Sequence, residues 1–444
     1  MNSYAERRAA LLRQMQAKGG GVAIIPTAPE VMRNRDADYP YRHDSYFYYL
    51  SGFTEPDAVI VLVCGEQQQQ SILFCRDKNM EREIWDGFRY GPEAARSAFG
   101  FDAAYAIDAL DTELPKLMAN APALFYALGS SDKLDTQVQS WLQNVRAQSR
   151  AGIVAPAAAY DVQILLDEMR VKKDAGEIDI MQRSADIAAA AHRRAMRIAK
   201  PGLREYHLEA EILHEFRTNG AQFPAYGSIV ATGANACVLH YRAGDVELKD
   251  GDLVLIDAGC ELDSYASDIT RTFPANGKFS GPQKTLYELV LAAQTAAIAE
   301  AVPGKRFMDG HEAAVKVLTQ GMLDAGLLDK NKVGSVDDAI ASRAYSQFYM
   351  HRTGHWLGMD VHDVGDYRDA YLNGTDRPWR TLQPGMVLTV EPGIYVRPAE
   401  GVPEQYWNIG IRIEDDALVT PDGVHILSAA APKTVADIEA VMKR

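Results

Sequence analysis

Acidic side chains stand directly after short apolar runs at three places in the sequence, at Asp257, Glu391 and Glu414. The runs, such as Leu253–Ile256 before Asp257, have the length and composition of buried strands. A carboxylate at the end of a buried strand lies at the edge of the core, where a proton, a cation or a metal must neutralise it. The recurrence of this pattern favours one shared site over three separate turns.

A fourth acid and a histidine extend this set. Asp268 follows Asp257 by eleven residues, among β-branched neighbours that are typical of a returning strand. Two carboxylates that face each other across a hairpin repel unless positive charge lies between them. His355 lies between the acid positions, in a chain with only 10 histidines. We therefore expect four carboxylates and one or two imidazoles together, and their charge calls for about two divalent cations.

The donor types indicate which metal and which reaction to expect. Four oxygen donors with a single imidazole favour Mn²⁺, and after it Co²⁺, Fe²⁺ or Zn²⁺, whereas a structural zinc site would need thiolates. Two such ions about 3.5–4 Å apart can share a bridging water and lower its pKa towards about 7. Hydrolysis by a metal-bridging hydroxide is the predicted reaction.

Each of these residues, taken alone, has a simpler structural interpretation. An isolated aspartate after a strand is more often a turn or capping residue, and a lone histidine such as His355 is often a core residue. Arg412, two residues before Glu414, has two interpretations: it pairs with Asp415 on a surface, or it supports the metal site from an apolar strand. The repeated acid pattern favours the second.

The chain has two regions that differ in their pattern of apolar and polar residues. Up to about residue 150, short β-rich runs alternate with helical stretches, which predicts an α/β domain with a sheet. After a stretch of small and polar residues, Asp174 and Glu177 form a capping box for a long amphipathic helix that ends at Pro201. Strands and helices then alternate through hairpin-like connections, which favours α+β over a doubly wound sheet. We place the domains at 1–172 and 173–444.

Composition excludes several classes of partner. The 444 residues carry a formal charge of -14, and nucleic acids or anionic membranes need clustered Lys and Arg instead. The N-terminal residues lack the apolar stretch of a signal peptide or membrane span, and the longest apolar runs are strand-sized. The four cysteines form no C-x-x-C pair, as expected for buried thiols in a reducing compartment. We expect a cytoplasmic protein.

With these motifs identified, the sequence resembles the aminopeptidase P family, among the pita-bread metallopeptidases that also include prolidase and methionine aminopeptidase. Six motifs in the family's order carry the resemblance: Val254–Gly259, Ser267–Phe273, His355–Gly358, Val361–Asp363, Thr389–Gly393 and Gly410–Asp415. Three further motifs resemble its N-terminal domain: Tyr39–Arg42, Tyr49–Phe53 and Glu55–Ala58. The resemblance covers essentially the whole chain and implies a pita-bread catalytic domain preceded by a smaller α/β domain.

The resemblance also implies roles for individual residues. The metal pair would be bound by five residues, with Asp268 and Glu414 contacting both ions: Asp257, Asp268, His355, Glu391 and Glu414. The substrate would be handled by His240, His351 and His362, with Tyr226 near the ions and Arg412 behind them. Glu391 would move the proton of the attacking water, and His362 would stabilise the oxyanion.

The expected function is therefore removal of one N-terminal residue from short peptides with proline second. Prolidase, which cleaves only Xaa-Pro dipeptides with much the same metal site, is the alternative within the fold. A second alternative is a binding module that has lost its metals, since fold does not fix function. The complete ligand set argues against that module, and Val402–Tyr406 before Gly410 is more like aminopeptidase P than prolidase. The resemblance further implies a homo-oligomer, a dimer or a tetramer.

Overall fold

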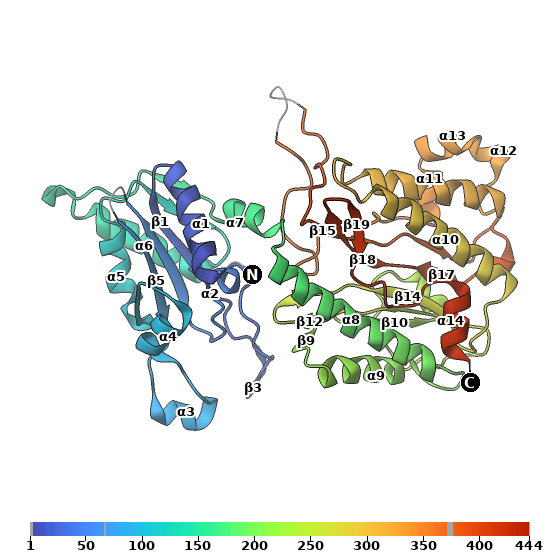
Figure 1. Cartoon of the computed structure of the whole chain (residues 1–444), viewed down its shortest axis with the longest axis horizontal. Coiled ribbons are helices and arrows are strands. Elements are labelled where there is room, and N and C mark those ends of the chain that lie inside the picture. Colours follow the sequence, from blue (N-terminus) through green and yellow to red (C-terminus); the bar gives the residue numbers. More distant parts are fainter. Residues whose placement is uncertain (1–2, 66–67, 371–375, 444) are drawn as a thin grey trace. The chain divides into compact units, whose positions relative to one another are not determined.

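The structure, a computed structural model, describes residues 3–65, 68–370 and 376–443. The chain divides into two compact units, Met1–Met169 and Arg170–Arg444, which are described separately (Figure 1). The predicted boundary, between residues 172 and 173, falls in the segment between helices α7 (Gln163–Arg170) and α8 (Ala175–Ile198).

A mixed six-stranded sheet is the centre of the first unit. Its order is β6-β5-β4-β1-β7-β8, and β4 alone runs antiparallel to both of its neighbours. The strands are β1 (Gly21–Pro26), β4 (Val59–Cys64), β5 (Gln69–Cys75), β6 (Ala103–Ala106), β7 (Ala123–Phe125) and β8 (Ala158–Tyr160). A separate pair comprises β2 (Met32–Asn34) and β3 (Ala37–Asp38). The predicted sheet strands are thus present.

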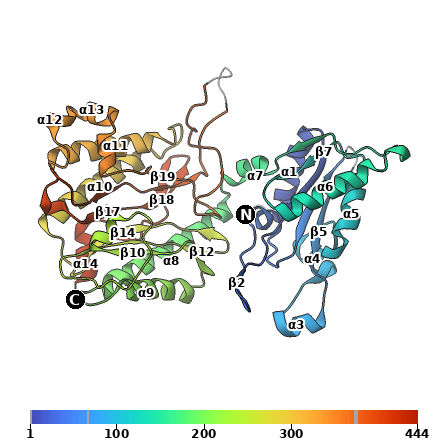
Figure 2. The same ribbon diagram turned by 180° about the vertical axis from the view of Figure 1, so that it is seen from behind.

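Helices cover both faces of this sheet. Views from opposite sides place α1 over one face and α6 over the other (Figures 1 and 2). The helices before α7 are α1 (Tyr4–Ala17), α2 (Ser45–Ser51), α3 (Met80–Asp86), α4 (Gly91–Phe99), α5 (Leu110–Met118) and α6 (Asp132–Arg146). Trp141 on α6 is fully buried against apolar strand residues such as Val22 and Phe74. This unit therefore has a hydrophobic core of its own.

The second unit begins with two packed helices that cover short antiparallel strands. Asp174 caps α8 and forms the predicted capping box with Glu177, and α9 (Glu205–Thr218) follows. Helix α8 packs on β12 and β13, and α9 packs on β9 and β10. The strands of this half are β9 (Phe223–Pro224), β10 (Ile229–Thr232), β11 (Leu253–Asp257), β12 (Cys260–Leu262), β13 (Tyr265–Ala266) and β14 (Thr270–Pro274).

A second pair of helices and a second set of strands complete this unit. Helices α10 (Gly281–Glu300) and α11 (Asp309–Asp324) pack together, and α10 lies on β15, β16 and β17. The strands are β15 (Val387–Val390), β16 (Gly393–Val396), β17 (Ile409–Arg412), β18 (Asp415–Thr420) and β19 (Gly423–Ile426). The shorter helices are α12 (Lys330–Val333), α13 (Val336–Ala341) and α14 (Val435–Met442).

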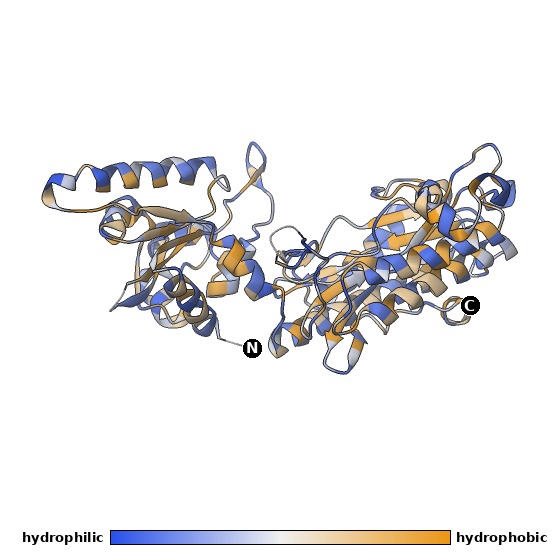
Figure 3. Cartoon of the chain, turned by 90° about the horizontal axis from the view of Figure 1, so that it is seen from above, coloured by the Kyte–Doolittle hydropathy of each residue, from blue (hydrophilic) through white to orange (hydrophobic). Residues whose placement is uncertain are grey.

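The two halves of the second unit meet at their strands. Thr270 and Glu414 form an antiparallel bridge, which joins the start of β14 to the segment between β17 and β18. Colouring by hydropathy shows hydrophobic strands inside this unit and helices with mixed faces around them (Figure 3). Within the described residues, no helix is long and apolar enough to span a membrane.

Candidate metal centre

Strand β11 and the segment before β14 place the first two acids. Asp257 ends β11 opposite Thr270, and Asp268 precedes that partner by two residues. Gly259 permits this approach, because a Cβ atom there would lie 1.7 Å from the carbonyl oxygen of Ser267. The predicted hairpin is present, with β12 and β13 between its long strands.

Asp268, His355 and Glu414 form the centre of the cluster. Each offers a ligand atom, and the three atoms lie within 4.8 Å of one another. His355 Nδ1 lies 2.9 Å from the carbonyl oxygen of Trp356, and Nε2 faces Asp268 at 3.4 Å and Glu391 at 3.8 Å. An Nδ1–H donated to a carbonyl fixes the tautomer in which Nε2 offers its lone pair to a metal.

Tyr226 joins the two aspartates. Its phenol oxygen lies 2.5 Å from Oδ1 of Asp257 and 2.5 Å from Oδ1 of Asp268. Because a phenol carries one proton, it can donate to only one of these oxygens at a time. The other short contact needs a proton on the carboxyl group or a cation nearby. The structure therefore places Tyr226 beside two of the predicted ligands.

Arg412 supports Asp257 from inside the protein. Its Nη2 donates to Oδ2 of Asp257 at 2.6 Å, and its Nη1 donates to the Tyr395 hydroxyl at 3.0 Å. Asp415 instead accepts from Arg271 at 2.6 Å. The interpretation of Arg412 as a surface partner of Asp415 is therefore wrong, and both groups are buried.

Thr270 holds the Glu414 carboxylate in place. The Thr270 hydroxyl donates to Oε2 of Glu414 at 2.6 Å and accepts from Nε of Arg412 at 3.2 Å. The Thr270 carbonyl also accepts the Glu414 backbone N–H at 3.1 Å. Thr270 is fully buried, so these three contacts are shielded from water.

Glu391 lies at the more open side of the cluster. Its side chain is 19% exposed, compared with 12% for Asp257 and 7% for Asp268. Its backbone N–H donates to the Thr353 carbonyl at 2.8 Å, which ties the start of the β15–β16 turn to the loop that carries His355. Glu391 is thus the carboxylate most accessible to a bound peptide.

Crowding of the acids changes their proton affinity. Burial, with the charge of Asp257, raises the pKa of Asp268, and burial with the charges of Asp268 and Glu391 raises the pKa of Glu414 well above its ordinary range. Burial raises the pKa of Glu391 to about 7. Burial alone would lower the pKa of His355, but its hydrogen bond with Asp268 and the charge of Asp268 raise it to about 9. Divalent cations would displace these protons, so the donor set fits a metal pair.

The sequence predicts three further histidines near this cluster. The His362 ring stacks on the His355 ring, with centroids 3.9 Å apart. His351 Nε2 lies 2.8 Å from the Tyr395 hydroxyl, and Nδ1 lies 3.9 Å from Glu391. His240 lies between Leu239 and Tyr241, which pack against the buried cluster that contains Tyr395. The structure thus places His351 and His362 beside the acids and His240 on a neighbouring loop.

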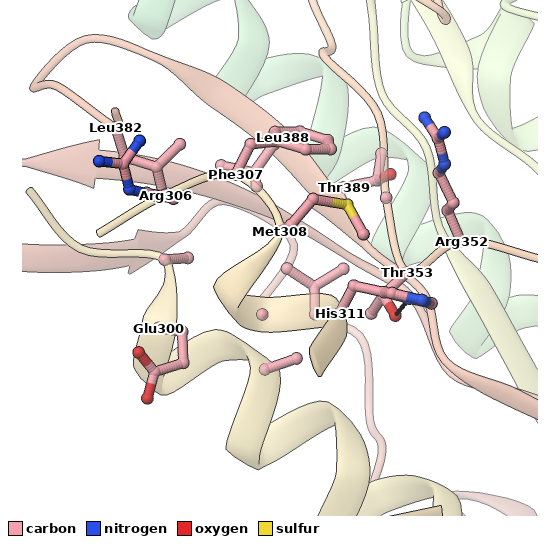
Figure 4. Close-up of a pocket in the computed structure, with 15 residues that line it drawn as sticks. Glu300, Arg306, Phe307, Met308, His311, Arg352, Thr353, Leu382, Leu388 and Thr389 are labelled. Carbon is pink, nitrogen blue, oxygen red and sulfur yellow. Dashed lines mark hydrogen bonds between the residues drawn. The ribbon is translucent and has the colours of Figure 1, made fainter. Parts of the chain in front are cut away.

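A hydrogen-bonded chain supports the loop between His351 and His355. His311 Nδ1 on α11 lies 2.9 Å from the Thr353 hydroxyl (Figure 4). That hydroxyl in turn lies 2.5 Å from the Tyr349 hydroxyl. Burial lowers the pKa of His311 to about 4, so its ring is neutral at pH 7. His311 therefore fastens this loop through a neutral hydrogen bond.

Sequence reasoning missed several supporting residues. Thr270 and Tyr395 contact site residues, and His311 contacts the loop that carries His355, yet each is an ordinary residue type on an ordinary element. Asp416, whose buried carboxylate accepts the Asp268 backbone N–H at 3.2 Å, was also missed. Of these residues, only Asp416 could have been found from the sequence, because it is an acid on the apolar strand that directly follows Glu414.

Comparison with known families assigns both parts of the chain. Residues 179–421 match the model described as metallopeptidase family M24, and residues 4–126 match the aminopeptidase P N-terminal domain. All five predicted ligands lie inside the first match.

Similar proteins match over nearly the full length. The Xaa-Pro aminopeptidase of Escherichia coli is 44% identical over 99% of this chain and 97% of its own, and human Xaa-Pro aminopeptidase 3 is 34% identical over 99% and 85%. The structure of Pseudomonas aeruginosa aminopeptidase PepP superposes with a TM-score of 0.94 at 49% identity, over 100% and 99% of the two chains. The structure of zinc-substituted E. coli aminopeptidase P in complex with product superposes with a TM-score of 0.93 at 44% identity, over 99% of this chain and 97% of that chain. These matches confirm the predicted α+β fold with an N-terminal domain and a pita-bread domain.

Proposed function

The chain belongs to metallopeptidase family M24 and is an Xaa-Pro aminopeptidase, and we propose that its reaction uses a metal pair held by five residues: Asp257, Asp268, His355, Glu391 and Glu414. One observation carries the proposal. Ligand atoms of Asp268, His355 and Glu414 converge within 4.8 Å in a chain that is 44% identical to an Xaa-Pro aminopeptidase along its length.

The metal pair suits oxygen donors. Asp268 and Glu414 belong to the convergent set of ligand atoms, and they would be the carboxylates that hold both ions. Mn²⁺ is the favoured ion because carboxylates outnumber the single imidazole, and Co²⁺, Fe²⁺ or Zn²⁺ fit the same donors less well. When bound, the pair supplies Lewis acidity that lowers the pKa of water towards about 7 and polarises the substrate carbonyl.

The scissile bond explains the use of this chemistry. The proline nitrogen carries no N–H, so a peptidase cannot hold the leaving group through a backbone donor before the bond breaks. Attack on a polarised carbonyl of the first residue avoids that problem. The substrate amino group would lie next to the carboxylate cluster, which limits cleavage to a single residue.

Glu391 is the group that moves the proton. As a carboxylate beside the attacking water, it can accept a proton from that water and release it to a leaving group. Its carboxylate is also the most exposed of the set, so it can reach both the attacking water and the proline nitrogen. Glu391 would therefore take the proton of the water and pass it to the leaving nitrogen.

The histidines hold the substrate. The His362 ring stacks on the His355 ring, and as a neutral imidazole it can donate one hydrogen bond to the developing oxyanion. His351 is also neutral, because burial and the charge of Arg412 lower its pKa to about 4. His351 and His240 would line the side that receives proline.

A peptide panel tests the activity and its specificity. Arg-Pro-Pro, Gly-Pro and Arg-Ala-Pro are incubated with the purified chain, with and without added Mn²⁺. We expect release of Arg from Arg-Pro-Pro alone, at a rate that rises with Mn²⁺. Preferred cleavage of Gly-Pro would indicate a dipeptidase, and no cleavage of any peptide with metal bound would refute the proposal.

Subunit number and compartment are also part of the proposal. Helix α3 exposes Met80 (72%), Ile84 (81%) and Trp85 (83%), and such an apolar surface favours a homo-oligomer, a dimer or a tetramer. Light scattering after gel filtration tests this, and a monomer would contradict it. All four cysteines are free and buried, which supports a reducing cytoplasm.

A further inference from the structure

Glu205, the first residue of α9, has a carboxylate that is completely buried. Two donors reach Oε1: the Thr232 backbone N–H at 2.9 Å and Asn235 Nδ2 at 3.0 Å. Two more reach Oε2: the Tyr241 hydroxyl at 2.8 Å and the Gly244 backbone N–H at 3.1 Å. Four neutral donors and the start of a 14-residue helix therefore stabilise this negative charge.

All four donors belong to one loop, residues 232–244. Thr232 and Asn235 lie at its start, and Tyr241 and Gly244 lie at its end, so one carboxylate closes the loop. The loop opens with a short 3-10 helix, Gly233–Cys237, and then has no helix or strand up to Gly244. Arg397 donates to the Cys237 carbonyl at 2.7 Å and so anchors the 3-10 helix, whereas the contacts of Glu205 with Tyr241 and Gly244 hold the irregular part that follows.

His240 lies in the turn of this loop, directly before the anchored Tyr241. The Tyr241 backbone N–H reaches back to the Val238 carbonyl at 3.3 Å, so the turn that presents His240 is short. The His240 side chain is exposed, and its neighbours Leu239 and Tyr241 pack against the buried cluster that contains Tyr395, whose hydroxyl lies 2.8 Å from His351 Nε2. An anchor at Tyr241 therefore restricts where the His240 ring can lie.

We propose that Glu205 is a positioning residue for the peptidase reaction, which holds the loop 232–244 so that His240 meets the substrate. The proposal rests on the proposed function, because it gives His240 a role on the proline side. Glu205 has no contact with the substrate in this scheme. It acts only through the geometry of the loop.

A double-mutant cycle of Glu205→Gln and His240→Ala tests this coupling. The amide of the introduced glutamine would present N–H groups to one pair of donors, so two of the four hydrogen bonds are lost while side-chain volume is kept. We expect Glu205→Gln to lower kcat/KM for Arg-Pro-Pro about tenfold in the unsubstituted background and less than about twofold with His240→Ala. Equal losses in the two backgrounds would overturn the proposal.

Hydrogen exchange gives a readout that is independent of activity. In Glu205→Gln, we expect faster exchange in peptides that cover residues 232–244, with no change in peptides from α10. Glu209→Gln is the matched control, since it removes a carboxylate one turn further along the same helix, and it should leave both measurements unchanged. Unchanged exchange in the loop of Glu205→Gln would overturn the proposal.

Two further controls separate the possible failures. Should Glu205→Gln fail to fold, Tyr241→Phe removes only one of the four donors, and the same cycle applies with a smaller loss. No Xaa-Pro cleavage by the unsubstituted protein would refute the proposed function, whereas the exchange experiment would still report whether Glu205 holds the loop.

Discussion

Replacing Thr270 by Val tests whether residues behind the ligands determine metal affinity. The substitution keeps the shape of the side chain and removes the hydroxyl that donates to Glu414 at 2.6 Å. A hydrogen bond to a charged group contributes about 1.5–3 kcal/mol. Loss of about 2 kcal/mol weakens Mn²⁺ binding about 30-fold, which lies within the range of about 10–100-fold for supporting partners of metal ligands.

The measurement is titration calorimetry with a competing chelator, together with the dependence of Arg-Pro-Pro hydrolysis on free Mn²⁺. Thr272→Val is the matched control, because Thr272 lies on the same strand and is equally buried, and its hydroxyl bonds the Arg412 backbone: it donates to the carbonyl at 3.0 Å and accepts the N–H at 3.3 Å. We expect this control to bind Mn²⁺ within about twofold of the unsubstituted protein. Thr270→Val with unchanged affinity, or equal weakening in both variants, would refute the reasoning.

Four other outcomes follow from the same geometry. Glu391→Gln should lower kcat by about 10²–10⁴-fold with the fold retained, and full activity would remove Glu391 from proton transfer. Burial raises the pKa of Glu391 to about 7 in chelator-treated protein, so its contribution to stability is complete below the unfolded pKa and is lost as pH rises through 7. Chemical denaturation should therefore find Glu391→Gln more stable than the unsubstituted protein by about 3 kcal/mol at pH 8 and similar to it at pH 4. A difference in stability that does not change with pH would contradict this. His362→Ala should reduce turnover far more than metal content by elemental analysis, whereas equal loss of both would make His362 a ligand. Removal of metal by a chelator should abolish cleavage. Mn²⁺ at 100 times its Kd should restore cleavage and stabilise the fold by about 2.7 kcal/mol in the same denaturation assay. Cleavage that survives chelation would contradict the metal proposal.

The sequence was most informative where the signal is local. An acid that ends an apolar run can be read from a few neighbouring letters, and so Asp257, Glu391 and Glu414 could be proposed as ligands from the sequence alone. The capping box of Asp174 and Glu177 likewise predicted the start of α8. These patterns succeed because strand burial and helix capping depend on neighbours in the chain.

The supporting residues could not be found in this way. Thr270 reaches Glu414 across 144 positions, and His311 reaches Thr353 across 42. Buried threonine and histidine are compatible with many environments, and only the tertiary fold decides which partner each one meets. The competing interpretation of Arg412 failed for the same reason, because its partner Asp257 lies 155 positions away while the neighbouring Asp415 is occupied by Arg271.

The bridge between Thr270 and Glu414 has a consequence for how the protein matures. The pair joins segments 144 residues apart, so the halves of the second unit must dock before a complete metal cage exists. Contacts of such long range form late, after local helices and hairpins. A ribosome-bound chain that has made only the α8–β14 half would therefore capture manganese poorly, and tight uptake of the ion would report that folding is finished.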